Sequence, residues 1–481
     1  MKQVKNNIRR VCIFLCILFA LLAAYGGYSI TVNGNRWFSS GANTFVRSKK
    51  KDVIAGHILD RNGQVLAYNQ QSQTAEGTKT TRLYHTDPLV RRAMVHVVGD
   101  SQGNVNNGVE SFMASSLYGF QMSLVERFSC FFRGVQRTGD DVHLTLDSRL
   151  SAYASGLFPK GKAGALVVMN YKTGEMLAEI SLPQYDPQNV TAQAKNDPQK
   201  PFYNRAVQGL YAPGSTFKIV TASSALENFT DAATRAWQCT GQLQVGDRFV
   251  TDAGTDMASG KIVSHGQLNL LRAFQVSCNN TFAQIALNLG DQKLKRTAEN
   301  FGFNDNFLFR DVVVENSSYP RENRTEREIA WTGVGQSGLT ATPLHMCMVA
   351  SAVANDGVMM EPYTVMRTVS ANGIMRTEAE SRVYKTAMKP EAAQVLKGYM
   401  RTVVQSGTGT AAQIPGVQVC GKTGSAEVDT QENTNAWFVG FIDNDAHPYA
   451  ISVVVEDAGG GGSVAAPIAK QVFQWMLNNG Y

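Results

Sequence analysis

The stretch YAPGSTFKIVTASSAL (211–226) decides how the rest of the chain is interpreted. Its apolar spacing predicts a helix over 217–226, and Ser215 stands at the opening of that helix, directly after Ala-Pro-Gly. A separation of three residues puts Lys218 on the same helical face, within reach of the Ser215 hydroxyl. Because a serine hydroxyl is a weak nucleophile without an adjacent base, this pair predicts a serine nucleophile activated by a neutral lysine.

A lysine base has to be neutral, although the ordinary pKa of lysine is about 10.4. We expect burial and a second cation to lower the pKa of Lys218, and Lys422 is the candidate for that cation. Lys422 begins the pattern Lys-Thr-Gly beside a predicted strand edge. There, Lys422 and Thr423 are suited to hold a substrate carboxylate, and Gly424 permits close approach of the backbone.

A third pattern, Ser-Cys-Asn at 277–279, lies in a loop between predicted helices. Ser277 and Asn279 are two residues apart and can point to one side, where they supply a hydroxyl for proton relay and an amide for hydrogen bonding. The backbone N–H groups of Ser215 and Ser425 are expected to form an oxyanion hole. Together, the three patterns predict acyl transfer through a serine.

Other copies of these short patterns occur, and their surroundings argue against a catalytic role. The SxxK copy at Ser48–Lys51 lies in a charge run, the SxN copy at Ser370–Asn372 belongs to an Asn-Gly turn, and the KTG copy at Lys172–Gly174 lies at the tip of a hairpin. The GxxxxGK[ST] match at Gly416–Thr423 lacks the following helix that a phosphate loop needs, and the GxSxG match at Gly99–Gly103 leads into a loop.

Strand patterns flank a helix-rich middle of the chain. A hairpin over 164–181 precedes it, and two strands over 434–443 and 449–457 follow it, with a Gly-rich loop at 459–462 expected near the active-site edge. Helical patterns cover 217–226, 268–289, 343–354 and 465–478. We therefore expect an α/β fold of the α+β type, with a central antiparallel sheet that joins strands from both ends and is flanked by helices.

The segment before this region shows turn-rich strand patterns without catalytic motifs. Residues 53–68 predict two strands around a turn, and 94–99 (MVHVVG) predict another strand. The predicted organisation is a small β-rich domain over 31–139, called the pedestal below, followed by a catalytic domain over 140–481.

Four basic residues precede an uncharged apolar run over 11–28, which predicts a retained signal-anchor. The positive flank predicts a cytoplasmic tail over 1–10, a transmembrane helix over 11–30 and an extracytoplasmic location for the rest. Residues 1–51 hold nine Lys/Arg and no acid, so the net charge of +6 reflects the membrane flanks. It gives no support to nucleic-acid binding.

The seven cysteines lack metal-site spacing and the seven histidines form no evident ligand cluster, so we predict no metal and no cofactor. Cys239 and Cys278 are a candidate disulfide pair in an extracytoplasmic domain, although most cysteines are expected to be buried thiols.

The motifs together resemble those of class B penicillin-binding proteins, the membrane-anchored D,D-transpeptidases of bacterial cell walls. Ser425 stands where many members carry threonine, which keeps a hydroxyl at that position. The resemblance is carried by NRAVQGLYAPGSTFK (204–218), SHGQLNLLRAFQVSCNNTFA (264–283), GQSGLTATPLHM (335–346), GKTGSAE (421–427) and, in the pedestal, GHILDRNGQVLA (56–67).

This resemblance implies an enzyme that cross-links peptidoglycan stem peptides. Ser215 would be acylated by the penultimate D-Ala of one peptide, and the amine of a neighbouring strand would attack the acyl-enzyme. Lys218 would act as base, Ser277 and Asn279 would orient and relay, and Lys422 with Thr423 would bind the terminal carboxylate. Penicillin and other β-lactams would trap the serine.

The resemblance also implies a separate membrane-embedded glycan polymerase as partner, because the pedestal is too short for the glycosyltransferase domain of class A members. Three alternatives share parts of the pattern. A D,D-carboxypeptidase or a β-lactamase-like hydrolase shares the acylation step, and a β-lactam sensor or scaffold shares only the binding.

Overall fold

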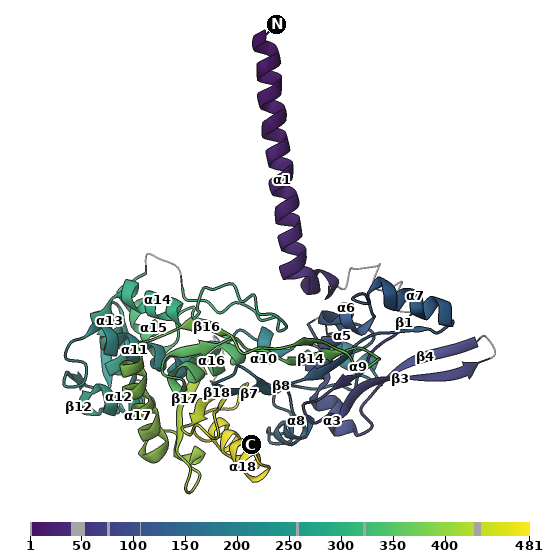
Figure 1. Ribbon diagram of the computed structural model, residues 1–481. Helices are drawn as coiled ribbons and strands as arrows, with labels where there is room; N and C mark the ends of the chain where they lie inside the picture. Colours follow the sequence, from purple (N-terminus) through teal and green to yellow (C-terminus); the bar gives the residue numbers. More distant parts are fainter. Residues whose placement is uncertain are drawn as a thin grey trace.

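The computed structural model describes residues 2–39, 53–74, 77–105, 107–255, 259–320, 324–427 and 434–481. Helix α1 (Lys2–Ser39) projects from a two-part body, which holds a five-stranded sheet in one part and a six-stranded sheet in the other (Figure 1). The segment Gln3–Ser29 is long and apolar enough to cross a membrane.

The five-stranded sheet is antiparallel throughout and combines strands from both ends of the catalytic segment, as predicted. Neighbouring strands in the sheet follow the order β17-β18-β19-β7-β8, so β17 lies at one edge. The strands are β7 (Gly164–Asn170), β8 (Met176–Leu182), β17 (Val419–Glu427), β18 (Thr434–Ile442) and β19 (Tyr449–Val455).

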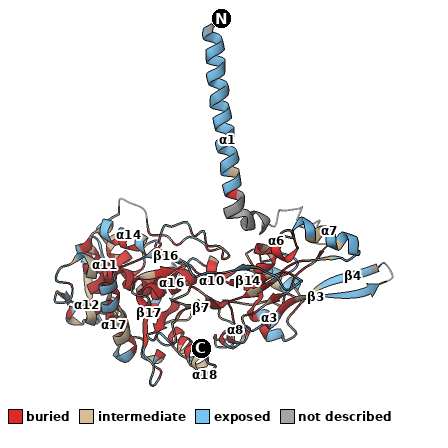
Figure 2. Ribbon diagram, viewed as in Figure 1, coloured by how far each residue is buried: buried red, intermediate tan, exposed pale blue. Residues whose placement is uncertain are grey.

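Both faces of this sheet are covered by helices (Figure 2). Along β7, Ala165, Val167 and Met169 pack into the core that contains α16 (Pro343–Ala354), while Leu166 and Val168 pack into the core that contains α18 (Ala465–Asn478). Every residue of α16 is buried. An apolar run without a polar face therefore forms the central helix of the domain.

Among the remaining helices of this part, α10 (Arg205–Gln208), α11 (Lys218–Asn228) and α17 (Pro390–Ser406) pack against α16. The others are α8 (Ser148–Ser155), α9 (Ala192–Asn196), η1 (Gly214–Phe217), α12 (Leu270–Gln275), α13 (Asn279–Leu289), α14 (Asp291–Asn300), α15 (Glu326–Val334) and η2 (Thr410–Ala412). The short strand pairs of this region are β9 (Ala236–Cys239) with β12 (Gly266–Asn269), β10 (Gln242–Val245) with β11 (Arg248–Thr251), and β13 (Val358–Met360) with β16 (Val383–Thr386).

The six-stranded sheet takes strands from both sides of residue 140. Its order is β15-β14-β6-β2-β3-β4, and only the β2–β6 pair is parallel. The sheet thus joins the two segments predicted as separate domains. Its strands are β2 (Ile58–Leu59), β3 (Val65–Thr74), β4 (Gly77–Tyr84), β6 (Asp141–Leu144), β14 (Val365–Val369) and β15 (Met375–Glu378), and β1 (Val53–Ile54) pairs with β5 (Arg137–Thr138) beside it.

The strand predicted over 94–99 is wrong, because Val95–Val98 form the short helix α4. All four residues are buried, and His96 Nε2 donates a hydrogen bond to Pro201 O at 2.7 Å. Burial on every side, rather than β-propensity, decides the conformation of this valine-rich stretch. The other pedestal helices are α3 (Pro88–Ala93), α5 (Val109–Phe112), α6 (Ala114–Leu117) and α7 (Leu124–Arg133).

Candidate active site

Ser215 lies in the short helix η1, which leads directly into α11 at Lys218. A 3₁₀ turn has three residues per turn, so residues 215 and 218 share one face, as predicted. The turn is held by close backbone packing: Gly214 has φ 53°, and its N–H donates to Gly335 O at 2.9 Å. A Cβ at Gly335 would come within 1.8 Å of Gly214 O, so glycine is required where the two segments meet.

Two buried lysines meet at the hydroxyl of Ser277. Lys218 Nζ donates to Ser277 O and to Asn279 Oδ1, both at 2.7 Å, and lies 3.3 Å from Ser277 Oγ. Lys422 Nζ donates to Ser277 Oγ at 2.8 Å and to Thr423 O at 3.0 Å. The three sequence patterns therefore meet in one hydrogen-bonded network, although they are far apart in the chain.

Both lysines are fully buried, and burial governs their protonation. Burial lowers the pKa of Lys218 to about 8, against the opposing influence of Cys278 and Asp252. Burial, and then the charge of Lys218, lowers the pKa of Lys422 well below its usual range. The lowering of the pKa expected for Lys218 thus comes from burial, whereas the contribution expected from Lys422 is absent, because it is the charge of Lys218 that lowers the pKa of Lys422. The pair can thus supply a neutral amine near physiological pH.

The hydroxyl of Ser215 is not part of this network in the described part of the chain: no hydrogen bond joins Ser215 Oγ to Lys218 Nζ there. Ser215 instead opens into a cavity of about 430 Å³, which Ser277 and Asn279 also line. Catalytic hydrogen bonds often tighten only when substrate is bound. Ser215 and Ser277 therefore border one substrate-sized cavity, and the two buried lysines contact Ser277 from behind its wall.

Strand β17 forms the opposite wall of the cavity. Thr423, Gly424 and Ser425 line it, whereas the fully buried Lys422 lies behind them. A Cβ at Gly424 would come within 3.0 Å of Thr216 Cγ2 and 3.1 Å of Pro213 O, so glycine lets β17 approach η1. Ser215 and Ser425 consequently line the same cavity.

Further residues line the cavity beyond those predicted to act in catalysis or binding. Gly460–Gly462 line the cavity, in agreement with the expected position of the Gly-rich loop. Trp331, Gln336 and Thr408 also line it, and Thr408 Oγ1 lies 2.6 Å from Thr423 Oγ1. The one signal for Gln336 was its place directly after a helix in the segment Gly-Gln-Ser at 335–337.

Asp252 is the main polar group that sequence reasoning missed. Its Oδ1 accepts the backbone N–H groups of Asn279 and, at 3.2 Å, of Asn280. Thr251 O accepts the side-chain amide of Asn279 at 2.9 Å. The end of β11 thereby fixes both the backbone and the side chain of Asn279, a residue that contacts Lys218.

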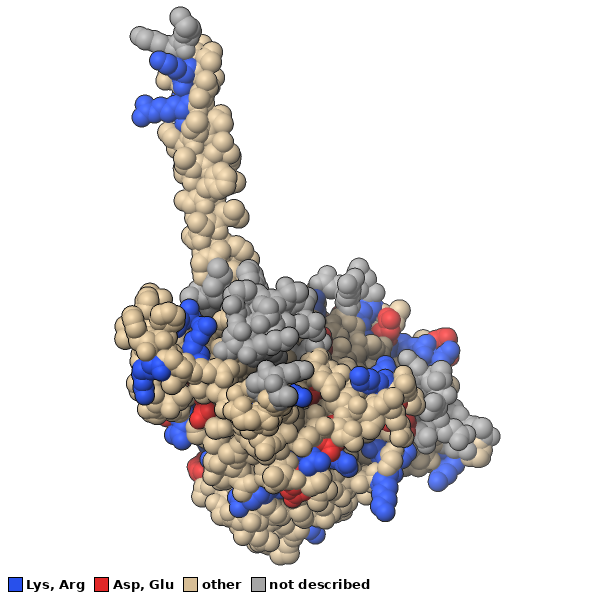
Figure 3. Space-filling view, turned by 90° about the vertical axis from the view of Figure 1, so that its right-hand side faces the viewer, with Lys and Arg blue, Asp and Glu red and all other residues tan. Residues whose placement is uncertain are grey.

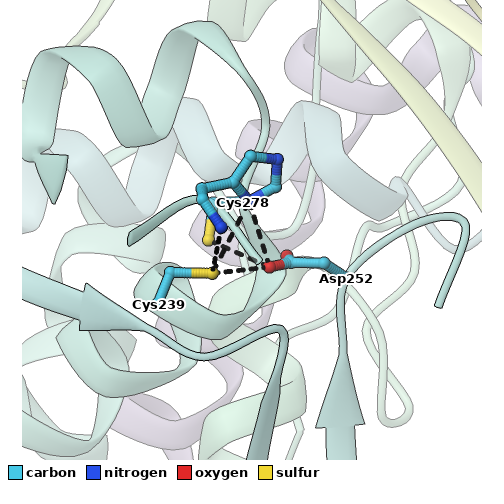
Figure 4. A group of neighbouring side chains, drawn as sticks. Cys239, Asp252 and Cys278 are labelled. Atoms are coloured by element: carbon cyan, nitrogen blue, oxygen red, sulfur yellow. Dashed lines mark hydrogen bonds and ion pairs between the residues drawn. The ribbon is translucent and has the colours of Figure 1, made fainter. Parts of the chain in front are cut away.

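Behind the Ser277–Asn279 segment, four side chains converge as a candidate metal centre: Cys239, Asp252, His265 and Cys278 (Figure 4). Their ligand atoms all lie within 4.8 Å of one another. Asp252 Oδ2 lies 2.9 Å from Cys239 Sγ, 3.3 Å from Cys278 Sγ and 3.3 Å from His265 Nδ1. Cys239 Sγ lies 3.5 Å from His265 Nδ1.

The donor set of two thiols, an imidazole and a carboxylate suits zinc, and three of the four separations above, at 3.3, 3.3 and 3.5 Å, fit a tetrahedral ion, while the 2.9 Å contact between Asp252 and Cys239 is shorter. Tetrahedral zinc with bonds of about 2.0–2.3 Å to sulfur, nitrogen and oxygen has edges of about 3.3–3.8 Å between ligands. The sequence prediction of no metal site missed this cluster because its members are brought together by folding rather than by a short motif. The disulfide considered for Cys239 and Cys278 is wrong in this structure, since all seven cysteines are free thiols.

Comparison with known proteins agrees with this geometry. Residues 164–474 match the family described as penicillin binding protein transpeptidase domain. The chain is 29% identical to the peptidoglycan D,D-transpeptidase PbpA of Mycolicibacterium smegmatis, over 99% of each chain. It is 30% identical to the peptidoglycan D,D-transpeptidase MrdA of Acinetobacter baumannii, over 70% of this chain and 54% of that protein.

Solved structures of related proteins superpose over most of the chain. The D,D-transpeptidase domain of a peptidoglycan glycosyltransferase from Eggerthella lenta matches with a TM-score of 0.77 and 32% identity, covering 89% of this chain and 99% of that one. The ceftriaxone acyl-enzyme of penicillin-binding protein A from M. tuberculosis matches with a TM-score of 0.80 and 25% identity, with the same coverage.

Proposed function

Because the chain belongs to the penicillin-binding protein transpeptidase family, we propose that its site cross-links peptidoglycan with Ser215 as nucleophile. The protein is a class B member, a serine-type D,D-transpeptidase that acts on peptidoglycan and binds β-lactams. The assignment of residues rests on one observation. Ser277 Oγ lies between Lys218 and Lys422, and Ser277 lines the same cavity as Ser215.

In the acylation step, the neutral amine of Lys218 takes the proton of the Ser215 hydroxyl. Ser215 Oγ then attacks the carbonyl carbon of the penultimate D-Ala, and the N–H groups of Ser215 and Ser425 stabilise the tetrahedral oxyanion. The C–N bond to the terminal D-Ala breaks, and the departing amine receives a proton through Ser277. Asn279 orients the base, supported by its hydrogen bond to Lys218.

The acyl-enzyme is resolved by an amine of a neighbouring strand, whose attack forms the cross-link and restores the free Ser215. Recognition of the substrate carboxylate falls to Thr423, which lines the cavity, and Lys422 behind the strand would carry the positive charge of the lysine pair when Lys218 is neutral. Lys422 also donates to Ser277, so the same residue supports proton relay and recognition.

Zinc chemistry is separate from these steps. A zinc ion held by Cys239, Asp252, His265 and Cys278 would act structurally, by fixing Asp252 under Asn279. These four side chains would fill every position of a tetrahedral zinc ion, as in structural zinc sites. The transpeptidase steps described above do not involve the ion.

The decisive experiment combines a fluorescent penicillin with the purified full-length protein. We expect covalent labelling that Ser215→Ala abolishes, while Ser370→Ala, in the non-catalytic SxN copy, retains it. Labelling that survives Ser215→Ala would contradict the assignment of the nucleophile. A D-Ala-D-Ala peptide with an amine acceptor then separates the reactions, since exclusive hydrolysis would indicate a D,D-carboxypeptidase.

Helix α1 is a single-pass membrane anchor. We propose that its N-terminus is cytoplasmic, because Lys5, Arg9 and Arg10 lie near the free end of the helix and the rest of the segment Gln3–Ser29 is uncharged (Figure 3). The catalytic domain is then extracytoplasmic, and a membrane-embedded glycan polymerase would contact α1 and the pedestal. Protease accessibility in sealed spheroplasts tests the orientation, and co-purification of a polymerase tests the partner.

A further inference from the structure

Helix α7 in the pedestal presents an apolar face that no described residue covers. It is a well-defined helix: Ser123 and Glu126 form a capping box at its start, and Gly134 ends it in the left-handed conformation. None of its residues is buried. The apolar side chains, each between 60% and 81% exposed, are Leu124, Val125, Phe128, Phe131 and Phe132.

The orientation of this face is set by two polar contacts, one from Glu126 on the opposite side of the helix and one from Arg127 on its flank. Glu126 forms an ion pair with Arg376 of β15, and Arg127 donates to Phe120 O at 2.8 Å. At 100° per residue, Glu126 lies roughly opposite Phe128 and Phe132. The helix is therefore fastened to the pedestal by its polar side, and its phenylalanines point away from the body.

The position of α7 identifies the occupant. α7 lies on the side of the pedestal from which α1 rises (Figure 1), and α1 contacts the neighbouring helices α5 and α6. An amphipathic helix with aromatic residues on one face is the type that lies in the membrane interface. Arg133, exposed at the end of α7, adds a cation suited to anionic lipid headgroups.

We propose that α7 inserts its apolar face into the outer surface of the lipid bilayer, as a second membrane contact beside the anchor. This inference rests on α1 spanning the membrane with the pedestal outside. The second contact would limit the rotation of the ectodomain about α1 and hold the pedestal side close to the bilayer. A contiguous exposed apolar patch commonly marks a site of contact with a membrane or with another protein.

Photo-crosslinking in lipid vesicles tests the proposal. The full-length protein, reconstituted in vesicles of phosphatidylethanolamine and phosphatidylglycerol, carries p-benzoylphenylalanine at position 132, and adducts are identified by mass. The matched control carries it in place of Leu89, which is 69% exposed on α3, away from α1 (Figure 1). A third variant carries it in place of Phe19 in the anchor.

We expect lipid adducts at positions 132 and 19 and at least tenfold fewer at position 89. Lipid adducts at position 19 without any at position 132 would overturn the proposal and leave the anchor intact. Adducts absent from both would overturn the membrane placement as well. In native membranes, a protein adduct at position 132 in place of lipid, whether with a second copy or with a polymerase, would also overturn it.

Discussion

Lys422 Nζ donates a hydrogen bond to Ser277 Oγ at 2.8 Å. The bond links the edge strand β17 to the loop between α12 and α13, and Lys218 lies on the other side of the same hydroxyl. A proton that leaves Ser215 through Lys218 can thus reach the departing amine along one connected path.

Replacing Lys422 tests this connection. Lys422→Met removes the donor to Ser277 and the charge behind Thr423, so we expect acylation by penicillin to slow by about 100-fold, within the range of general acid–base contributions. The control is Lys172→Met in the hairpin copy of the same motif, where Lys172 is surface-exposed and pairs with Asp445. Stopped-flow fluorescence measures both rates, and equal rates for the two variants would refute the role of Lys422.

The pH dependence of acylation follows from the lowered pKa of Lys218, about 8. The reactive form is the neutral amine, which accumulates as the pH rises through that value. We therefore expect the acylation rate to rise about tenfold per pH unit below about pH 8 and to level off above it. A rate that falls with pH over this range would exclude Lys218 as the base. The control is the chemical hydrolysis of the same penicillin without protein.

The sequence predicts the parts of the site that are local in the chain. Ser215 and Lys218 share a face because they are three residues apart, and the strands within 164–181 and 434–457 are recognisable as apolar runs bounded by turn residues, as expected of strands buried on both faces. The burial of Lys218 was likewise predictable, because Lys218 lies at the start of an apolar helix.

Contacts created by folding were outside the reach of pattern reasoning. Asp252 approaches Asn279 from the end of a two-stranded ribbon, and Cys239 meets Cys278 across 39 residues of sequence without a recurring spacing. The stretch 94–99 shows the opposite error: its valines satisfy a strand pattern, yet tertiary packing makes four of its residues a helical turn.

Gly335 is expected to control the shape of the nucleophile turn. Its φ is 99°, and an added Cβ would meet Gly214 O at 1.8 Å, so Gly335→Ala both strains the backbone and displaces η1. We expect a loss of about 1–3 kcal/mol in the free energy of unfolding and about tenfold slower acylation. Gly246→Ala is the control, because Gly246 has φ 64° but no atom within 4 Å of its added Cβ. Equal acylation rates in the two variants would contradict this role.

The candidate zinc centre makes the last prediction. A zinc ion would hold Asp252 in place and keep the Cys239 and Cys278 thiols, which lie within 4.8 Å of each other, from oxidising to a disulfide outside the cell. We expect about one equivalent of zinc in the purified protein by plasma mass spectrometry, and a melting temperature that falls by several degrees on chelation. Cys278→Ser should lose the metal and this chelator response, whereas Cys347→Ser, at a buried thiol of the sheet core, should retain both. Protein that contains no metal and joins Cys239 to Cys278 in a disulfide would refute the zinc centre, because a ligand pair oxidised in this way cannot bind the ion.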